Sequence, residues 1–134
     1  MSKKIFIDTG YVIALANQRD DYHSQAIALG QKFKQAELLT TDAVLLEIGN
    51  GLASYYRPQA VAIIEKLLNS PQIQIVHLTP SLFQEAFALY KQYQDKSWGL
   101  VDCSSFVVMK QYDIQTALSF DKHFAQAGFE IDLL

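Results

Sequence analysis

Short apolar runs alternate with stretches of helical periodicity along this chain, and this alternation limits the fold more than any other feature. Four runs have the length and the β-branched or aromatic content of buried strands: Lys4–Asp8, Glu37–Thr41, Ile73–Leu78 and Thr116–Phe120. Each is followed by one or more segments whose apolar residues recur at helical spacing. The alternation predicts an α/β fold, with a mostly parallel sheet that helices cover on both faces.

The segments between these runs predict helices whose first residues include good capping side chains. Asp20 or Asp21 is expected to cap one helix, Asp42 a helix that runs through Leu52, and Ser97 a helix that ends near Tyr112. Further helices are expected over Tyr11–Ala16, from Pro58, from Thr79-Pro80 and over Lys122–Ala127, and Phe129–Leu133 is a candidate edge strand.

Four acidic residues lie where such a fold brings distant segments together. Asp8 and Asp121 end apolar runs, while Glu47 and Asp102 fall early in helices expected to begin at the same edge of the sheet. Ligands of parallel sheets bind at the carboxyl ends of the strands. A carboxylate beside apolar residues is costly unless it is paired or holds a cation. One such acid is usually a cap or an ion pair, but four at one edge predict a shared site.

Other reactive side chains show no comparable pattern. His23, His77 and His123 have no second His or Cys at ligand spacing, and a surface or capping role is expected for His123. Cys103 has no base nearby in the sequence and is expected to be a small buried residue. Asn50, one helical turn beyond Glu47, is either a polar neighbour of the site or a plain surface contact. The Tyr and Phe residues are expected mostly in the core rather than in a base-stacking platform.

Length and charge restrict the class of protein further. The chain has 134 residues, which predicts a single domain over residues 1–134, and its net charge of −3 does not suit binding to nucleic acid through bulk charge. Nucleic-acid chemistry would need a bound cation or a local basic patch. The single cysteine excludes an intrachain disulfide, and no apolar run approaches the ~20 residues of a membrane span. A soluble cytoplasmic protein without a membrane partner is the expectation.

Four motifs, taken in order, resemble those of the PIN domain. They are Phe6-Ile7-Asp8-Thr9-Gly10, Leu45-Leu46-Glu47-Ile48-Gly49-Asn50, Val101-Asp102-Cys103 and Leu118-Ser119-Phe120-Asp121-Lys122-His123-Phe124. Within that family, the chain is similar to the VapC-like toxins of bacterial and archaeal toxin–antitoxin pairs. The likeness spans essentially the whole sequence. It implies a three-layer α/β/α sandwich around a mostly parallel sheet, and a ribonuclease that depends on Mg²⁺ or Mn²⁺.

The resemblance also implies roles for individual residues. Asp8, Glu47, Asp102 and Asp121 match the four acids that line the catalytic metal pocket of the family. We expect Asp8 and Asp102 to hold the principal Mg²⁺ ion, and Glu47 and Asp121 to complete the site through water or around a second metal. The hydroxyls beside the first and last acids, those of Thr9 and Ser119, also match family positions.

The expected partners are an RNA substrate, a small antitoxin protein and a second copy of the chain. The apolar helices around Leu52–Tyr56 and Val61–Ile64 are the candidate dimer surface, although the same residues also suit a core. Two alternatives to a toxin nuclease are an RNA-processing enzyme of the same fold and a non-catalytic binding module. A receiver-type phosphoacceptor domain ranks low, because its first strand would end in paired acids.

Overall fold

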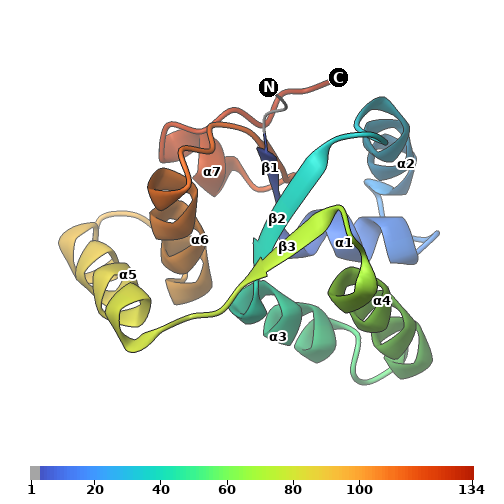
Figure 1. Cartoon of the computed structure of the whole chain (residues 1–134), viewed down its shortest axis with the longest axis horizontal. Coiled ribbons are helices and arrows are strands. Elements are labelled where there is room, and N and C mark those ends of the chain that lie inside the picture. Colours follow the sequence, from blue (N-terminus) through green and yellow to red (C-terminus); the bar gives the residue numbers. More distant parts are fainter. Residues whose placement is uncertain (1–3) are drawn as a thin grey trace.

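The computed structural model describes residues 4–134 and shows an α/β fold built on a parallel sheet (Figure 1). The strand order is β3-β2-β1-β4, and every pair of neighbours runs parallel. The strands span β1 Lys4–Ile7, β2 Glu37–Thr41, β3 Ile73–Val76 and β4 Ala117–Leu118. The predicted α/β class and the parallel sheet are therefore confirmed.

Helices cover both faces of this sheet. Figure 1 places α1, α2 and α4 on one side and α5, α6 and α7 on the other, while α3 packs against α1 and α4. This is the expected three-layer arrangement. The helices span α1 Thr9–Ala16, α2 His23–Lys32, α3 Asp42–Gly51, α4 Arg57–Asn69, α5 Pro80–Gln92, α6 Leu100–Gln111 and α7 Lys122–Gln126.

Burial on both faces explains why β1 contains the continuous apolar run Ile5–Ile7. β1 lies between β2 and β4, and Phe6, Ile7 and Leu39 are almost completely buried. Burying a side chain of this size stabilises the fold by about 1.5–3 kcal/mol, so the two central strands anchor the core. Phe124 on α7 packs against Phe6, with ring centroids 6.1 Å apart. The core therefore holds the ends of β1 and β4 in fixed positions.

The start of α3 differs from the prediction that Asp42 is its cap. The N-cap is Thr41, whose Oγ1 accepts a hydrogen bond from the backbone N–H of Val44 at 3.1 Å. The Asp42 carboxylate instead accepts from the backbone N–H of Leu78 at 3.0 Å, and lies 3.3 Å from Nδ1 of His77. Asp42 thus ties the beginning of α3 to the segment that follows β3, a tertiary contact in place of a local cap.

Two further boundaries differ from the prediction. The second helix has Tyr22 at its N-cap, and Asp20 accepts a hydrogen bond from the Tyr22 backbone N–H in the preceding turn. At the other end of the chain, 129–133 forms no strand in the described structure, and only an isolated bridge joins Thr116 to Glu130. In residues 4–134, none of the helices combines the length and the apolar character needed to cross a bilayer.

Candidate active site

Asp8 is a buried carboxylate at the junction between β1 and α1. It occupies the N-cap position of α1, and 7% of its surface is exposed. Burial raises the pKa of Asp8 to about 7 and outweighs hydrogen bonds from the Thr9 backbone and the Ser119 hydroxyl, which lower it; the charges of Asp102 and Glu47 add to the rise. Without a nearby cation, Asp8 therefore holds a proton close to neutral pH.

The hydroxyl of Ser119 connects the first and last acids of the sequence. Its Oγ donates to Oδ2 of Asp8 at 3.0 Å and accepts from the backbone N–H of Asp121 at 3.0 Å. Ser119 follows β4, whose pairing with β1 sets this contact across 111 sequence positions. The parallel pairing thus places the two predicted strand-end acids beside one hydroxyl.

Glu47 reaches the same place from α3. The Thr9 hydroxyl donates to Oε1 of Glu47 at 2.6 Å, a short hydrogen bond of the kind that charged acceptors form. Thr9 directly follows Asp8 in the sequence, but its side chain is hydrogen-bonded to Glu47. α3 begins directly at the end of β2, which is why its second turn lies next to the first residue of α1.

Asp102 is the third residue of α6, and its carboxylate folds back onto the helix start. Oδ2 of Asp102 accepts a hydrogen bond from the backbone N–H of Gly99 at 3.0 Å. Gly99 is the N-cap, so the prediction that Ser97 caps this helix is wrong. The backbone N–H groups at a helix start favour a negative charge there, which makes this an acceptable position for a carboxylate.

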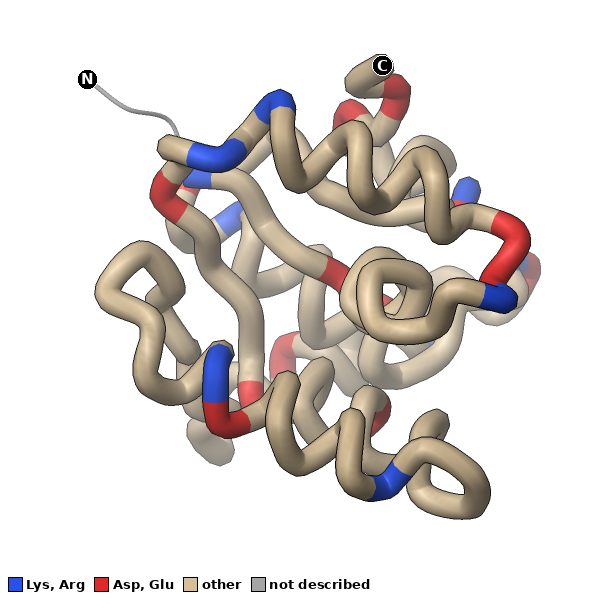
Figure 2. Tube along the Cα trace, turned by 90° about the vertical axis from the view of Figure 1, so that its right-hand side faces the viewer, with Lys and Arg blue, Asp and Glu red and all other residues tan. Residues whose placement is uncertain are grey.

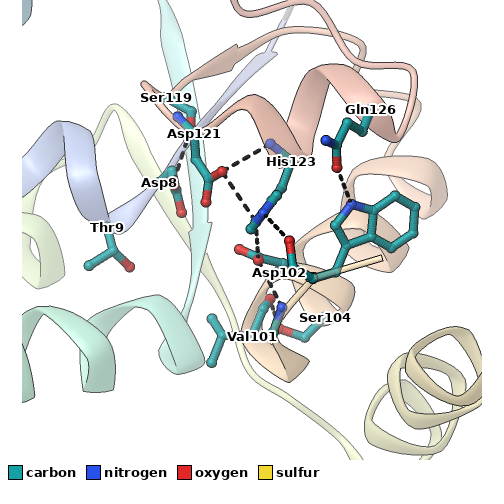
Figure 3. Close-up of polar contacts among 12 residues, drawn as sticks. Asp8, Thr9, Val101, Asp102, Ser104, Ser119, Asp121, His123 and Gln126 are labelled. Atoms are coloured by element: carbon teal, nitrogen blue, oxygen red, sulfur yellow. Dashed lines mark hydrogen bonds and ion pairs between the residues drawn. The ribbon is translucent and has the colours of Figure 1, made fainter. Parts of the chain in front are cut away.

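His123 is the residue that sequence reasoning undervalued. Figure 3 shows its ring between the carboxylates of Asp102 and Asp121, and Nδ1 lies 3.0 Å and 3.2 Å from their oxygens. Nε2 lies 3.1 Å from the hydroxyl of Ser97. The His123 side chain is 19% exposed, so it is not simply a surface residue, although its backbone N–H does donate to Asp121, the N-cap of α7. The two-residue spacing from Asp121 was the available signal.

One open cavity collects all four predicted acids, Asp8, Glu47, Asp102 and Asp121. Its described lining contains no Lys or Arg. Along the backbone, Figure 2 shows several acidic positions inside the trace and most basic ones toward its periphery, some of them directly beside acidic positions. Besides the acids, the lining residues are Thr9, Gly10, Ile13, Asp20, Tyr22, Asn50, Gly51 and Phe120.

The donors that line this cavity, together with the adjacent His123, suit a divalent cation. Ligand atoms of Asp102, Asp121 and His123 lie within 4.8 Å of one another. Carboxylate oxygens are the preferred ligands of Mg²⁺, and an imidazole nitrogen extends the set to Mn²⁺. The buried carboxylate of Asp8 adds a further reason, because a cation would offset the cost of its ionisation. The chemistry of the side chains therefore fits a metal centre.

Comparisons with known proteins agree with this geometry. The PIN-domain family model matches residues 5–130. The 23S rRNA-specific endonuclease VapC20 of Mycobacterium tuberculosis, from two strains, is 30% identical over 125 residues, which cover 93% of this chain and 95% of the relative. The crystal structure of M. tuberculosis VapC20, described as a sarcin–ricin loop cleaving toxin, superposes with a TM-score of 0.86 at 30% identity, covering 94% of this chain and 96% of that one. The chain belongs to the PIN-domain family.

Proposed function

We propose that this protein is a metal-dependent ribonuclease that hydrolyses RNA phosphodiester bonds and serves as the toxin of a toxin–antitoxin pair. The observation that carries the proposal is the gathering of Asp8, Glu47, Asp102 and Asp121 around one open cavity. Membership of the PIN family and the named activity of VapC20 support it. The four acids are the proposed catalytic and metal-binding residues, and Mg²⁺ is the proposed ion, with Mn²⁺ as the substitute.

Each acid is held by a neighbour that limits its freedom. Asp8 and Asp102 would hold the principal ion; Ser119 orients the first, and Gly99 and His123 orient the second. Glu47, fixed by the Thr9 hydroxyl, and Asp121, fixed by backbone and His123 contacts, complete the site, and one of them orients the attacking water. A bound divalent ion supplies positive charge to the phosphate and lowers the pKa of water.

The resemblance to the PIN-domain family implies the following reaction. Water attacks phosphorus, and the bond between phosphorus and the 3′ oxygen breaks. The proton released by water passes to a carboxylate of the cavity, and the 3′ oxygen takes up a proton from solvent. The products carry a 5′-phosphate and a 3′-hydroxyl. Because burial makes the negative charge of Asp8 costly, a bound divalent cation would stabilise its ionised form.

The finer proposals concern partners and location. We propose a cytoplasmic location and a small antitoxin that covers the acidic cavity to block it. We also propose a homodimer that forms through α4 and the segment between α3 and α4. In that segment Leu52 is buried in the core and Tyr55 is 89% exposed, and in α4 Val61 is 51% exposed. Sedimentation analysis of a Tyr55→Lys, Val61→Lys variant tests this surface: a monomer is expected, and an unchanged dimer would place the interface elsewhere.

The activity test uses a hairpin with the sarcin–ricin loop sequence beside mixed cellular RNA, each with Mg²⁺, Mn²⁺ or chelator. Wild type is expected to cleave only with metal, and an Asp8→Asn, Asp102→Asn variant is expected to be inactive. Asp113→Asn is the matched control, because this exposed residue has a φ of 55°, which Asn tolerates, and it lies outside the cavity lining. If the double variant cleaved RNA as well as wild type does, Asp8 and Asp102 would not be catalytic residues. No cleavage by a folded, metal-loaded wild type would favour the binding-module alternative.

A further inference from the structure

Tyr22 presents an aromatic ring at the edge of the acidic cavity. It stands at the N-cap of α2, is 46% exposed, and lines the cavity together with Asp8, Glu47 and Asp121. An exposed aromatic ring loses the benefit of burial, so its position beside a polar cavity suggests a partner for the ring. None of the contacts of Asp8, Glu47 or Asp121 described above involves Tyr22.

The ring of Tyr22 is part of a set of three packed aromatic side chains. Tyr22 stacks on Phe120, with centroids 4.5 Å apart and planes 9° apart. Phe120 in turn packs against the buried ring of Tyr11, with centroids 6.5 Å apart. The backbone is fixed as well, because the Tyr22 N–H donates to Oδ1 of Asp20 at 2.8 Å. A column of three rings therefore runs from the core to the edge of the cavity.

Position separates Tyr22 from the other exposed aromatic residues. Seven of the Tyr and Phe residues are exposed, which is more than the sequence led us to expect. Within residues 4–134, Tyr22 is the only one of these seven that lines the acidic cavity; the other aromatic residue in the lining, Phe120, is partly buried. Phe120, the middle ring of the column, directly precedes the acid Asp121 in the sequence. Its placement is thus fixed relative to the proposed reaction centre.

Because the cavity is lined by acidic residues, a contact to RNA that needs no positive charge would help the cavity to bind RNA. Its described lining holds acids but no Lys or Arg, and the whole chain carries a net charge of −3. Phosphate attraction through basic residues, the usual source of RNA affinity, is therefore missing at this place. Stacking of a base on an aromatic ring requires no positive charge and tolerates any base. It can hold RNA beside carboxylates that would otherwise repel it.

We propose that Tyr22 is a platform on which a base of the RNA substrate stacks, so that a neighbouring phosphodiester lies over the four acids. This proposal rests on the ribonuclease function proposed above. Tyr22 binds and positions substrate, while Phe120 and Tyr11 support its ring from behind. Since stacking on one ring contributes to affinity by roughly 5- to 100-fold, its loss should be measurable in a single variant.

The test measures binding separately from cleavage. The probe is the sarcin–ricin hairpin with 2-aminopurine placed in turn at each loop position, titrated with Asp8→Asn protein in Mg²⁺ so that cleavage does not interfere. Stacking on an aromatic ring quenches 2-aminopurine. We expect one position to be quenched with Tyr22 present. Tyr22→Leu, which still covers Phe120, should abolish the quenching and weaken binding by about 5- to 100-fold. Tyr22→Phe should restore both.

Tyr112→Leu is the matched control, since this residue is 39% exposed but lies at the C-terminal end of α6, away from Asp102. It should leave quenching and affinity unchanged. Equal binding by the Tyr22→Leu protein, or quenching that persists in it, would overturn the platform. So would an absence of RNA binding by the parent protein. Cleavage by wild type that does not depend on Tyr22 would reject the platform and keep the nuclease. Tyr22-dependent quenching without cleavage would reject the nuclease and keep the platform.

Discussion

Replacing Asp8 with Asn should make the metal-free protein less sensitive to rising pH. Burial raises the pKa of Asp8 from 3.8 to about 7 in the folded state, whereas the unfolded chain retains the ordinary value. The folded protein thus binds this proton more tightly. The resulting stability is fully present below the unfolded pKa, and is lost as the pH rises through the folded pKa. The Asn side chain is neutral throughout, so the variant escapes this loss.

The size of the effect follows from the shift. A difference of roughly three pKa units corresponds to about 4 kcal/mol between the fully protonated and fully ionised limits. Part of the change is complete by pH 5, so about 2–3 kcal/mol of it falls between pH 5 and pH 8. In a chain of this length, that change moves the midpoint of thermal unfolding by roughly 10 °C.

The assay is unfolding at both pH values in chelator, followed by the fluorescence of Trp98, which is the single tryptophan and is buried. The stability of Asp8→Asn relative to wild type should increase by the stated amount from pH 5 to pH 8. Asp113→Asn, which alters an exposed carboxylate, should show no such trend. Adding Mg²⁺ at pH 8 should stabilise wild type more than Asp8→Asn. A stability difference that stays constant with pH would refute the reasoning.

Three further changes test individual contacts. Ser119→Ala removes the hydrogen bond from the Ser119 hydroxyl that lowers the pKa of Asp8. The acidic limb of the pH profile of kcat/KM should therefore move to higher pH. An unchanged limb would argue that this hydrogen bond does not set the pKa on which activity depends. Burial raises the pKa of the Cys103 thiol to about 11. Iodoacetamide at pH 8 should therefore label the native protein at least ~100-fold more slowly than the urea-unfolded protein, as followed by mass spectrometry. Equal labelling rates would contradict the burial of Cys103. Thr41→Val removes the α3 cap and should lower the free energy of unfolding by about 1 kcal/mol in urea titration; no loss would mean that Thr41 is not the effective cap.

The sheet could be predicted because parallel strands bury both faces. β1 stands out because it contains the continuous apolar run Ile5–Ile7, in which Phe6 is fully buried. Asp8 and Asp121 were found for the same reason: a charge directly after a buried strand lies at the carboxyl edge of the sheet. The structure brings Asp8 and Asp121 to one cavity through the β1–β4 pairing. For these two acids, the position at the end of a strand in the sequence was enough to predict their place in the fold.

The caps and the histidine could not be predicted, because distant partners decide them. Thr41 and Asp42 are both good caps, and the choice depends on Asp42 meeting the backbone of Leu78, 36 positions later. Ser97 likewise does not cap α6, and its hydroxyl contacts His123, 26 positions away. Short-range rules rank such side chains almost equally. Only the folded arrangement of the segments settles which partner each one finds.

The pairing of β1 with β4 makes the acidic cavity depend on a contact between opposite ends of the sequence. β1 begins at Lys4, and β4 lies at Ala117–Leu118, so their contact closes a loop of more than a hundred residues. Long loops of this kind close slowly. Until they close, Ser119 and Asp121 are far from Asp8, and the cavity is incomplete. The proposed site can therefore be complete only in a chain whose first and last strands are paired.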